Sequence, residues 1–359
     1  MYAERMAGLR QEMTRAGVDV ALLSLGFDLP YLTGYAAMPL ERITMLVVRP
    51  DDATLVVPAL EAPRVVRHDD LFEVRPWGET EDPLDLIAYL AGMANTVAVG
   101  EQTWAGFVLG LQARLPLARW VGSAGLTRSM RMRKSPFEID ALRAVAHAAD
   151  EVAMQIAAEP WAGRSERNLA RRIHDLLIGA GHDAVSFTIV ASGPHGASPH
   201  HEPGGRTITP GDVVVCDFGG VKDGYCSDTT RTFAVGEPTA EIARAHASLL
   251  EAQQAAVAGV APGVTAGSVD RVARRILTGS GFGEFFIHRT GHGIGLDVHE
   301  EPYIVEGNDL VLEPGMAFSI EPGIYMPDRW GMRIEDIVVV TDDGVEVLNR
   351  SERSLVVVA

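Results

Sequence analysis

The 359-residue sequence has only two cysteines, Cys216 and Cys226. Two cysteines are too few for a secreted scaffold held together by disulfides, and we expect both to pack in the core. No apolar run approaches the ~18 residues that a membrane span needs, and the first residues, MYAERMAGLRQEM, lack the apolar segment of a signal peptide. We therefore expect a cytoplasmic protein without a membrane segment.

Basic residues are also scarce, because 31 Lys and Arg stand against 48 Asp and Glu, giving a net charge of −17. A nucleic-acid-binding protein usually carries a basic face, so we expect no nucleic-acid partner. The sequence also contains neither a G-x-S-x-G nucleophile elbow nor a P-loop. The acidic excess instead suits a protein that binds divalent metal through carboxylates.

Residues 1 to about 125 alternate short apolar runs with helical patterns, which predicts an α/β domain. The predicted strands are 18–24, 43–48, 53–60, 72–77 and 96–101, and the predicted helices are 3–17 and 83–94. Next, Ser135-Pro136-Phe137-Glu138 forms a capping-box pattern with proline at the first helical position. We place a domain boundary before this helix, giving domains 1–128 and 129–359.

The second part looks internally doubled. Two helices precede a strand–turn–strand segment, and this order then repeats; the helices are predicted at about 135–159, 165–179, 239–258 and 265–279. The tetrapeptide ARRI occurs at 170–173 and again at 273–276. The matching order of elements predicts two related halves that face each other.

Two hairpins each carry a pair of carboxylates. If Val221 and Gly224 close the first turn, Asp217 and Asp228 stand directly opposite with Cβ atoms ~5 Å apart. Such a pair repels unless a cation lies between, and the alternative is a solvated acidic hairpin; the apolar run VVVCDFG favours burial. Glu321 and Glu335 repeat the arrangement across a loop centred near Asp328.

The segment HRTGHGIGLDVHE, residues 288–300, concentrates three histidines. His288 and His292 have the spacing of a zinc-binding helix, but arginine stands where that motif needs glutamate, and the three glycines oppose a helix. We interpret the segment as a loop close to a site, entering a short strand at LDVHE. His200 and His201, just before the first hairpin, are further candidates. His195 is undecided, and a structural role is favoured for His68, His147, His174, His182 and His246.

This constellation resembles the metallopeptidase family of pita-bread fold, which includes methionine aminopeptidase, aminopeptidase P and prolidase. The five ligand positions of that family match, in order, Asp217, Asp228, His292, Glu321 and Glu335. The contexts GHGIGLDVHE, SIEPGIY and GMRIED match too, and LPYLTGY at 29–35 is similar to the N-terminal domain of proline peptidases. The resemblance implies a creatinase-like α/β domain (1–128) and a pita-bread α+β catalytic domain with pseudo-two-fold symmetry (129–359).

The resemblance implies two divalent ions per subunit. Asp217 would bind one ion and His292 the other, with Asp228 and Glu335 bridging the pair and Glu321 beside His292. Such hard donors suit Mn²⁺, which we expect, or Co²⁺ or Fe²⁺, with Zn²⁺ as a further candidate. Two ions ~3.5–4 Å apart can activate a water molecule and polarise the scissile carbonyl.

The resemblance also implies roles for other residues. Glu321 resembles the general base that shuttles the proton. His200 and His299 resemble the histidines that contact substrate and stabilise the tetrahedral intermediate. His288 resembles the histidine that lines the proline pocket, and Arg333, also placed in the substrate-binding set, is expected to orient a carboxylate ligand. A homodimer is implied as well.

The expected activity is release of the N-terminal residue from Xaa-Pro peptides. A dipeptidase needs a positive group near the substrate carboxylate, and in prolidases an arginine soon after the second signature histidine looks suited to that task. Residues 300–315 contain no Lys or Arg, which favours a Xaa-Pro aminopeptidase, whereas the chain length favours the alternative, a strict Xaa-Pro dipeptidase (prolidase). Two less favoured hypotheses are a creatinase-like hydrolase or lyase acting on a small non-peptide substrate, and a non-catalytic binding module.

Overall fold

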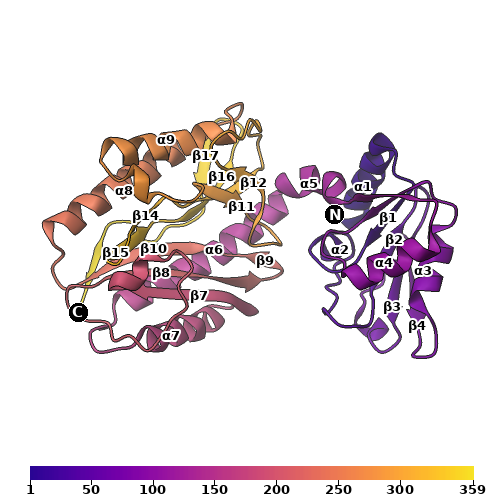
Figure 1. Ribbon diagram of the computed structural model, residues 1–359, viewed down its shortest axis with the longest axis horizontal. Helices are drawn as coiled ribbons and strands as arrows, with labels where there is room; N and C mark the ends of the chain where they lie inside the picture. The colour runs from indigo at the N-terminus through magenta and orange to yellow at the C-terminus, as the bar shows by residue number, and fades with distance from the viewer. The chain divides into compact units, whose positions relative to one another are not determined.

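The computed structural model describes residues 1–359, which divide into two compact units, 1–131 and 132–359. Figure 1 traces both units by residue number. None of the helices is both long and apolar enough to cross a bilayer. Both cysteines are free and buried, as predicted.

The first unit is built on one six-stranded mixed sheet in the order β4-β3-β2-β1-β5-β6. Its strands are β1 (Val20–Leu23), β2 (Met45–Val48), β3 (Ala53–Pro58), β4 (Glu73–Trp77), β5 (Thr96–Val99) and β6 (Arg119–Gly122). Its helices are α1 (Tyr2–Ala16), α2 (Asp28–Thr33), α3 (Pro83–Ala91) and α4 (Ala105–Arg114), and α5 (Ala124–Met132) ends it. All five predicted strands and both predicted helices are present. Helices α2, α4 and α5 and the edge strand β6 were not predicted.

Four helices of the second unit begin at side-chain caps, which explains why their starts are readable in the sequence. They are α6 (Pro136–Ala157), α7 (Glu166–Gly179), α8 (Ala240–Ala258) and α9 (Ala266–Gly279). Ser135 and Glu138 form the complete capping box predicted for α6. Ser165, Thr239 and Thr265 cap the other three helices.

Two sheets and a hairpin complete the second unit. The first sheet runs β18-β10-β8-β7, with β9 paired to β8; the second runs β12-β11-β13-β16-β17; β14 pairs with β15. The strands of the first sheet are β7 (Ala184–Ser192), β8 (Val213–Lys222), β9 (Tyr225–Cys226), β10 (Thr229–Val235) and β18 (Val356–Val358). The others are β11 (Gly291–Gly293), β12 (Glu300–Ile304), β13 (Ala317–Ile320), β14 (Gly323–Met326), β15 (Trp330–Arg333), β16 (Asp336–Val340) and β17 (Val345–Val347).

The two helix pairs cover opposite sides of these sheets (Figure 1). Residues of α6 and α7 share one core cluster with β7, β8 and β10. Residues of α8 and α9 share another with β13, β15 and β16. The predicted doubling is therefore visible as two helix–helix–sheet halves, which leave the strand ends between them for a site.

The predicted register of the first hairpin is wrong. Asp217 pairs with Thr230, and Lys222 pairs with Tyr225, so the turn is centred on Asp223-Gly224. Both central residues have positive φ, 51° and 82°, which Asp-Gly tolerates far better than Lys-Asp. Asp228 consequently lies in the break between β9 and β10, and Asp217 does not face it across the ladder.

The second hairpin has the predicted register. Gly323 pairs with Arg333, and Ile320 pairs with Asp336, so Glu321 and Glu335 occupy opposite positions around a centre at residue 328. The histidine segment differs from prediction. Gly291–Gly293 form strand β11, whereas residues 294–299 bend and the next strand begins only at Glu300.

Candidate active site

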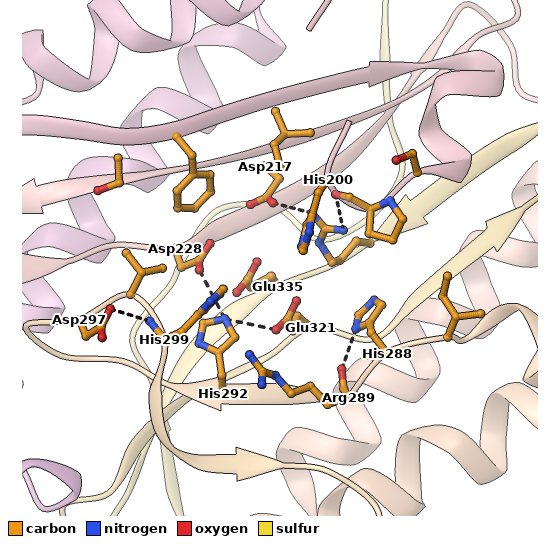
Figure 2. Close-up of a pocket in the computed structure, with 18 residues that line it drawn as sticks. His200, Asp217, Asp228, His288, Arg289, His292, Asp297, His299, Glu321 and Glu335 are labelled. Carbon is orange, nitrogen blue, oxygen red and sulfur yellow. Dashed lines mark hydrogen bonds and ion pairs between the residues drawn. The ribbon is translucent and has the colours of Figure 1, made fainter. Parts of the chain in front are cut away.

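A cavity of about 930 Å³ in the second unit brings together all but one of the site candidates from the sequence, the exception being His201 (Figure 2). It is of a size that holds a small ligand. The lining residues that were candidates are His200, Asp217, Asp228, His288, His292, His299, Glu321, Arg333 and Glu335. Side chains from β7, β8, the loop around 198–200, Asp228, the segment 287–299 and the β13–β16 region thus converge on one space.

Asp217, Asp228 and Glu335 are buried and close enough for one oxygen of each to lie within 4.8 Å of the others. An oxygen of Glu335 also lies within 4.8 Å of ligand atoms of His292 and Glu321. Glu335 therefore belongs both to the group with Asp217 and Asp228 and to the group with His292 and Glu321. Burial and then the neighbouring carboxylates, Glu335 first, raise the pKa of Asp228 well above its ordinary value. Burial and then Glu321 do the same to the pKa of Glu335. Such mutual repulsion is what a bound cation relieves.

Two buried carboxylate oxygens of this cluster, Asp217 Oδ1 and Glu335 Oε1, have no hydrogen-bond partner. The second oxygen of each of these two carboxylates accepts a hydrogen bond from a protein group. Arg333 donates to Asp217 Oδ2, and Thr230 Oγ1 donates to Glu335 Oε2 over 2.8 Å. Each carboxylate is therefore oriented from behind and presents a free oxygen. Unpartnered buried carboxylate oxygens fit metal coordination and are costly without it.

His292 is oriented to use its Nε2 atom. Its Nδ1 lies 3.1 Å from the carbonyl oxygen of Gly293, which can only accept, so Nδ1 carries the proton. Nε2 lies 3.6 Å from Asp228 Oδ2 and 3.3 Å from Glu321 Oε1. Burial, followed by the charge of His299, lowers the pKa of His292 to about 3. The ring is neutral, as a metal ligand must be.

Glu321 differs from the other acids because its Oε1 accepts a bond of 3.2 Å from Ser319 Oγ. Burial raises its pKa to about 7, against an opposing effect of Arg333. A carboxyl group with a pKa near neutrality can both take up and release a proton at the pH of the cell. Glu321 lies beside His292, with its Oε1 3.3 Å from His292 Nε2.

A hydrogen-bonded chain links Arg333, Tyr325 and His288. Arg333 Nη1 donates to the Tyr325 hydroxyl over 2.6 Å, and that hydroxyl lies 2.9 Å from His288 Nε2. His288 Nδ1 donates to the Arg289 carbonyl over 2.7 Å. Burial, and then Arg333, lowers the pKa of His288 to about 3, so its ring presents a neutral face to the cavity.

The side chain of Arg333 donates its hydrogen bonds to other groups of the protein. It binds Asp217, Tyr325 and, through Nε at 3.0 Å, the Thr230 hydroxyl. These contacts hold Asp217 in place, which agrees with an orienting role.

His299 and His200 line the same cavity without belonging to the cluster of acids. The His299 ring lies edge-to-face on His292, with centroids 4.1 Å apart. Burial, and then Arg289, lowers the pKa of His299. Figure 2 shows both histidines beside the acidic cluster, His200 near Asp217 and His299 near Asp228.

His201 and His195 do not reach the cavity, because both bind Glu166. His195 Nδ1 lies 3.0 Å from Glu166 Oε1, and His201 Nε2 lies 2.9 Å from Glu166 Oε2. Of the pair 200–201, therefore, only His200 lines the cavity.

Three residues of structural importance to the site were not singled out from the sequence: Arg289, which lines the cavity, Tyr325 and Glu166. Arg289 stands inside the histidine segment, where it was considered only as evidence against a zinc helix. Its position between two site histidines was the available signal. Glu166 carries no sequence signal beyond its place at the start of α7.

The comparisons with known proteins agree with this geometry. Residues 140–342 match Metallopeptidase family M24, and residues 5–133 match the Creatinase/Prolidase N-terminal domain. The chain is 44% identical to a protein named probable dipeptidase PepE from Mycobacterium tuberculosis, covering 100% of this chain and 97% of that protein. It is 38% identical to a Xaa-Pro dipeptidase from Lactobacillus helveticus, covering 98% of each.

A solved structure of recombinant prolidase from Thermococcus sibiricus superposes with a TM-score of 0.94 at 37% identity, covering 99% of this chain and 98% of that one. The predicted combination of a creatinase-like domain and a pita-bread domain is thereby confirmed. The names of these relatives favour the dipeptidase alternative over the aminopeptidase that the sequence favoured. By matches that extend over nearly its whole length, the chain belongs to metallopeptidase family M24 and is a peptidase.

Proposed function

We propose that the protein is a metal-dependent Xaa-Pro dipeptidase that hydrolyses the bond before the proline of a dipeptide. The observation that carries this proposal is the buried cluster of four carboxylates and His292 Nε2, with two carboxylate oxygens unpartnered, at the floor of a cavity of about 930 Å³. The matched relatives are named dipeptidase or prolidase, and the matches cover nearly their full length, which supports the substrate class.

Two divalent ions would be held by Asp217, Asp228, His292, Glu321 and Glu335, and Glu335 is common to the two groups of ligands. Ions bound there would activate a water molecule and polarise the scissile carbonyl. The excess of carboxylate oxygen favours Mn²⁺, with Co²⁺, Fe²⁺ or Zn²⁺ as alternatives. We also propose that the boundary between the two domains lies at 128/129 and that the protein assembles as a homodimer.

The protein's own groups supply proton transfer and orientation. Glu321, whose Oε1 lies 3.3 Å from His292 Nε2, takes the proton from the attacking water and passes it to the leaving proline nitrogen. His299 and His200 face the substrate carbonyl and donate to the oxygen as charge develops on it. His288, neutral and held by Tyr325, presents the side of the pocket on which the proline ring packs. Arg333 keeps Asp217 in position.

The test is a parallel assay of Ala-Pro, Ala-Pro-Ala and Ala-Ala with added Mn²⁺. A dipeptidase should cleave Ala-Pro well, Ala-Ala poorly and Ala-Pro-Ala least. Equal or faster cleavage of Ala-Pro-Ala would establish the aminopeptidase alternative instead. No cleavage of any of the three in metal-loaded protein would defeat the proposal and favour a small non-peptide substrate.

A further inference from the structure

The cavity contains two guanidinium groups, and only one of them has an anionic partner. Arg333 is buried and bound to Asp217. Arg289 lines the same cavity, half-buried, and its side chain makes no hydrogen bond and no ion pair. A cation that lines a cavity and forms no ion pair there favours binding of an anionic ligand.

Arg289 is nevertheless held in place. Its guanidinium carbon lies 4.3 Å from the centroid of the Tyr303 ring, a cation–π contact that supports the flat face of the group. Its backbone carbonyl accepts the bond from His288 Nδ1. Stacking leaves the N–H edges unused, and these edges are what pair with a carboxylate through two parallel bonds.

Arg289 lies among the proposed catalytic groups. It lines the same cavity as Glu321, His292 and His299. Figure 2 shows its side chain in the same space as His292 and Glu321. The unpaired cation thus lies in the same cavity as the proposed metal ligands, not at a remote part of the surface.

The substrate offers one matching anion. In a Xaa-Pro dipeptide the terminal carboxylate is one residue from the scissile carbonyl, and one residue spans at most about 3.6 Å. Its partner must therefore line the same cavity as the catalytic groups. Residues 300–315, where the resemblance to prolidases led us to expect an arginine, contain no basic residue. Tyr303, which supports Arg289, lies within that segment.

We propose that Arg289 binds the C-terminal carboxylate of the dipeptide and thereby restricts the enzyme to dipeptides. This inference rests on the proposed dipeptidase function and names the residue that sets its substrate length. Residues 300–315 contain no positive group for the substrate carboxylate, which had counted against a dipeptidase. With Arg289 in this role, the positive group precedes His292 in the sequence and does not follow His299.

The experiment compares Arg289→Met with wild type on Ala-Pro and on Ala-Pro amide, which lacks the negative charge. A charge-assisted bidentate bond to a carboxylate is lost, so kcat/KM for Ala-Pro should fall roughly 10- to 100-fold, mainly through KM. The amide, which makes no such bond, should change less than about 3-fold. The ratio of kcat/KM for Ala-Pro to kcat/KM for the amide should therefore fall sharply in the variant.

Product binding gives a second readout. Inhibition by L-proline should weaken in the variant to the level of L-prolinamide, because only the free acid carries the carboxylate. Arg275→Met is the matched control, since it makes the same charge change on the exposed side of α9. Arg289→Lys keeps the charge but loses the fork, and should recover part of the selectivity.

The outcomes separate this inference from the proposed function. If wild type does not cleave Ala-Pro, the proposed function fails. If wild type cleaves Ala-Pro and Arg289→Met keeps its preference for the free acid, or loses activity equally on both substrates with Arg289→Lys behaving the same way, the role of Arg289 is refuted while the dipeptidase stands.

Discussion

Glu166 should hold the loop that carries His200 into the cavity, and its replacement by glutamine is the sharpest test of how the site is built. Its side chain is fully buried and accepts five donors: Ser192 N and Oγ, His195 Nδ1, His201 Nε2 and Gly204 N, at 2.7–3.2 Å. These donors all belong to residues 192–204, so one carboxylate ties both ends of the loop to the start of α7.

The magnitude follows from the pKa of the carboxyl group. Burial alone would raise it, but hydrogen bonds, led by those from Ser192, lower it from 4.5 to about 2. That difference corresponds to about 3 kcal/mol of unfolding free energy. Because the folded pKa lies below the unfolded one, this stabilisation is complete above about pH 4.5 and is lost as the pH falls towards 2. Glutamine keeps the shape but turns an acceptor into a donor that faces other donors.

Urea unfolding, followed by circular dichroism, should show Glu166→Gln to be less stable by roughly 3 kcal/mol at pH 7, with a smaller deficit near pH 3. The variant should also lose about 100-fold in kcat on Ala-Pro, since a shift of about 1 Å in a positioned group can cost that much. Faster amide exchange confined to 192–204 would locate the effect. Glu251→Gln, on an exposed face of α8, is the control. Equal stability of Glu166→Gln and wild type at pH 7 would refute the anchoring argument.

Two further perturbations address the metal cluster. Chelation should abolish Ala-Pro hydrolysis and lower the melting temperature, because the buried carboxylates then repel one another. Mn²⁺ or Co²⁺ should restore the activity and the melting temperature. At 100 times Kd the bound metal should add about 2.7 kcal/mol to the free energy of unfolding. Full activity of protein shown to be metal-free would rule out the proposed ligand role. Gly291→Ala should weaken metal binding on the order of 10- to 100-fold, since its Cβ would collide with the carbonyl of Ser319 and displace His292. Gly106→Ala, where a Cβ meets nothing, should bind metal normally.

The sequence was sufficient wherever local chemistry determines structure. The N-caps at Ser135, Ser165, Thr239 and Thr265 mark four helix starts because each side chain bonds the backbone of its own first turn. The register of the second hairpin also follows from local pattern, since apolar residues run up to each glutamate. The first hairpin failed because we centred the turn on Lys222-Asp223, although Asp-Gly one residue later suits the positive φ of a two-residue turn.

The histidine segment shows where local reasoning ends. Its glycines excluded a helix, but they equally permit a strand that lies too close to its neighbours for any side chain. A Cβ at Gly293 would meet the carbonyl of Glu301, and one at Gly291 that of Ser319. Those neighbours are brought up by β12 and β13, so the strand Gly291–Gly293 depends on tertiary contacts that no window of the sequence contains.

The two arginines of the cavity make the same point about function. Each lies within two residues of a site residue in sequence, Arg289 after His288 and Arg333 before Glu335, and each could serve a substrate carboxylate. Arg333 lies opposite Gly323 in the hairpin, which brings it to Asp217, so its charge is used to hold a carboxylate of the metal cluster. Arg289 leaves the backbone just before β11, where its guanidinium stacks on the uncharged ring of Tyr303 and forms no ion pair. Pairing in one case and stacking in the other decides which cation stays available, and so which of them can select the substrate.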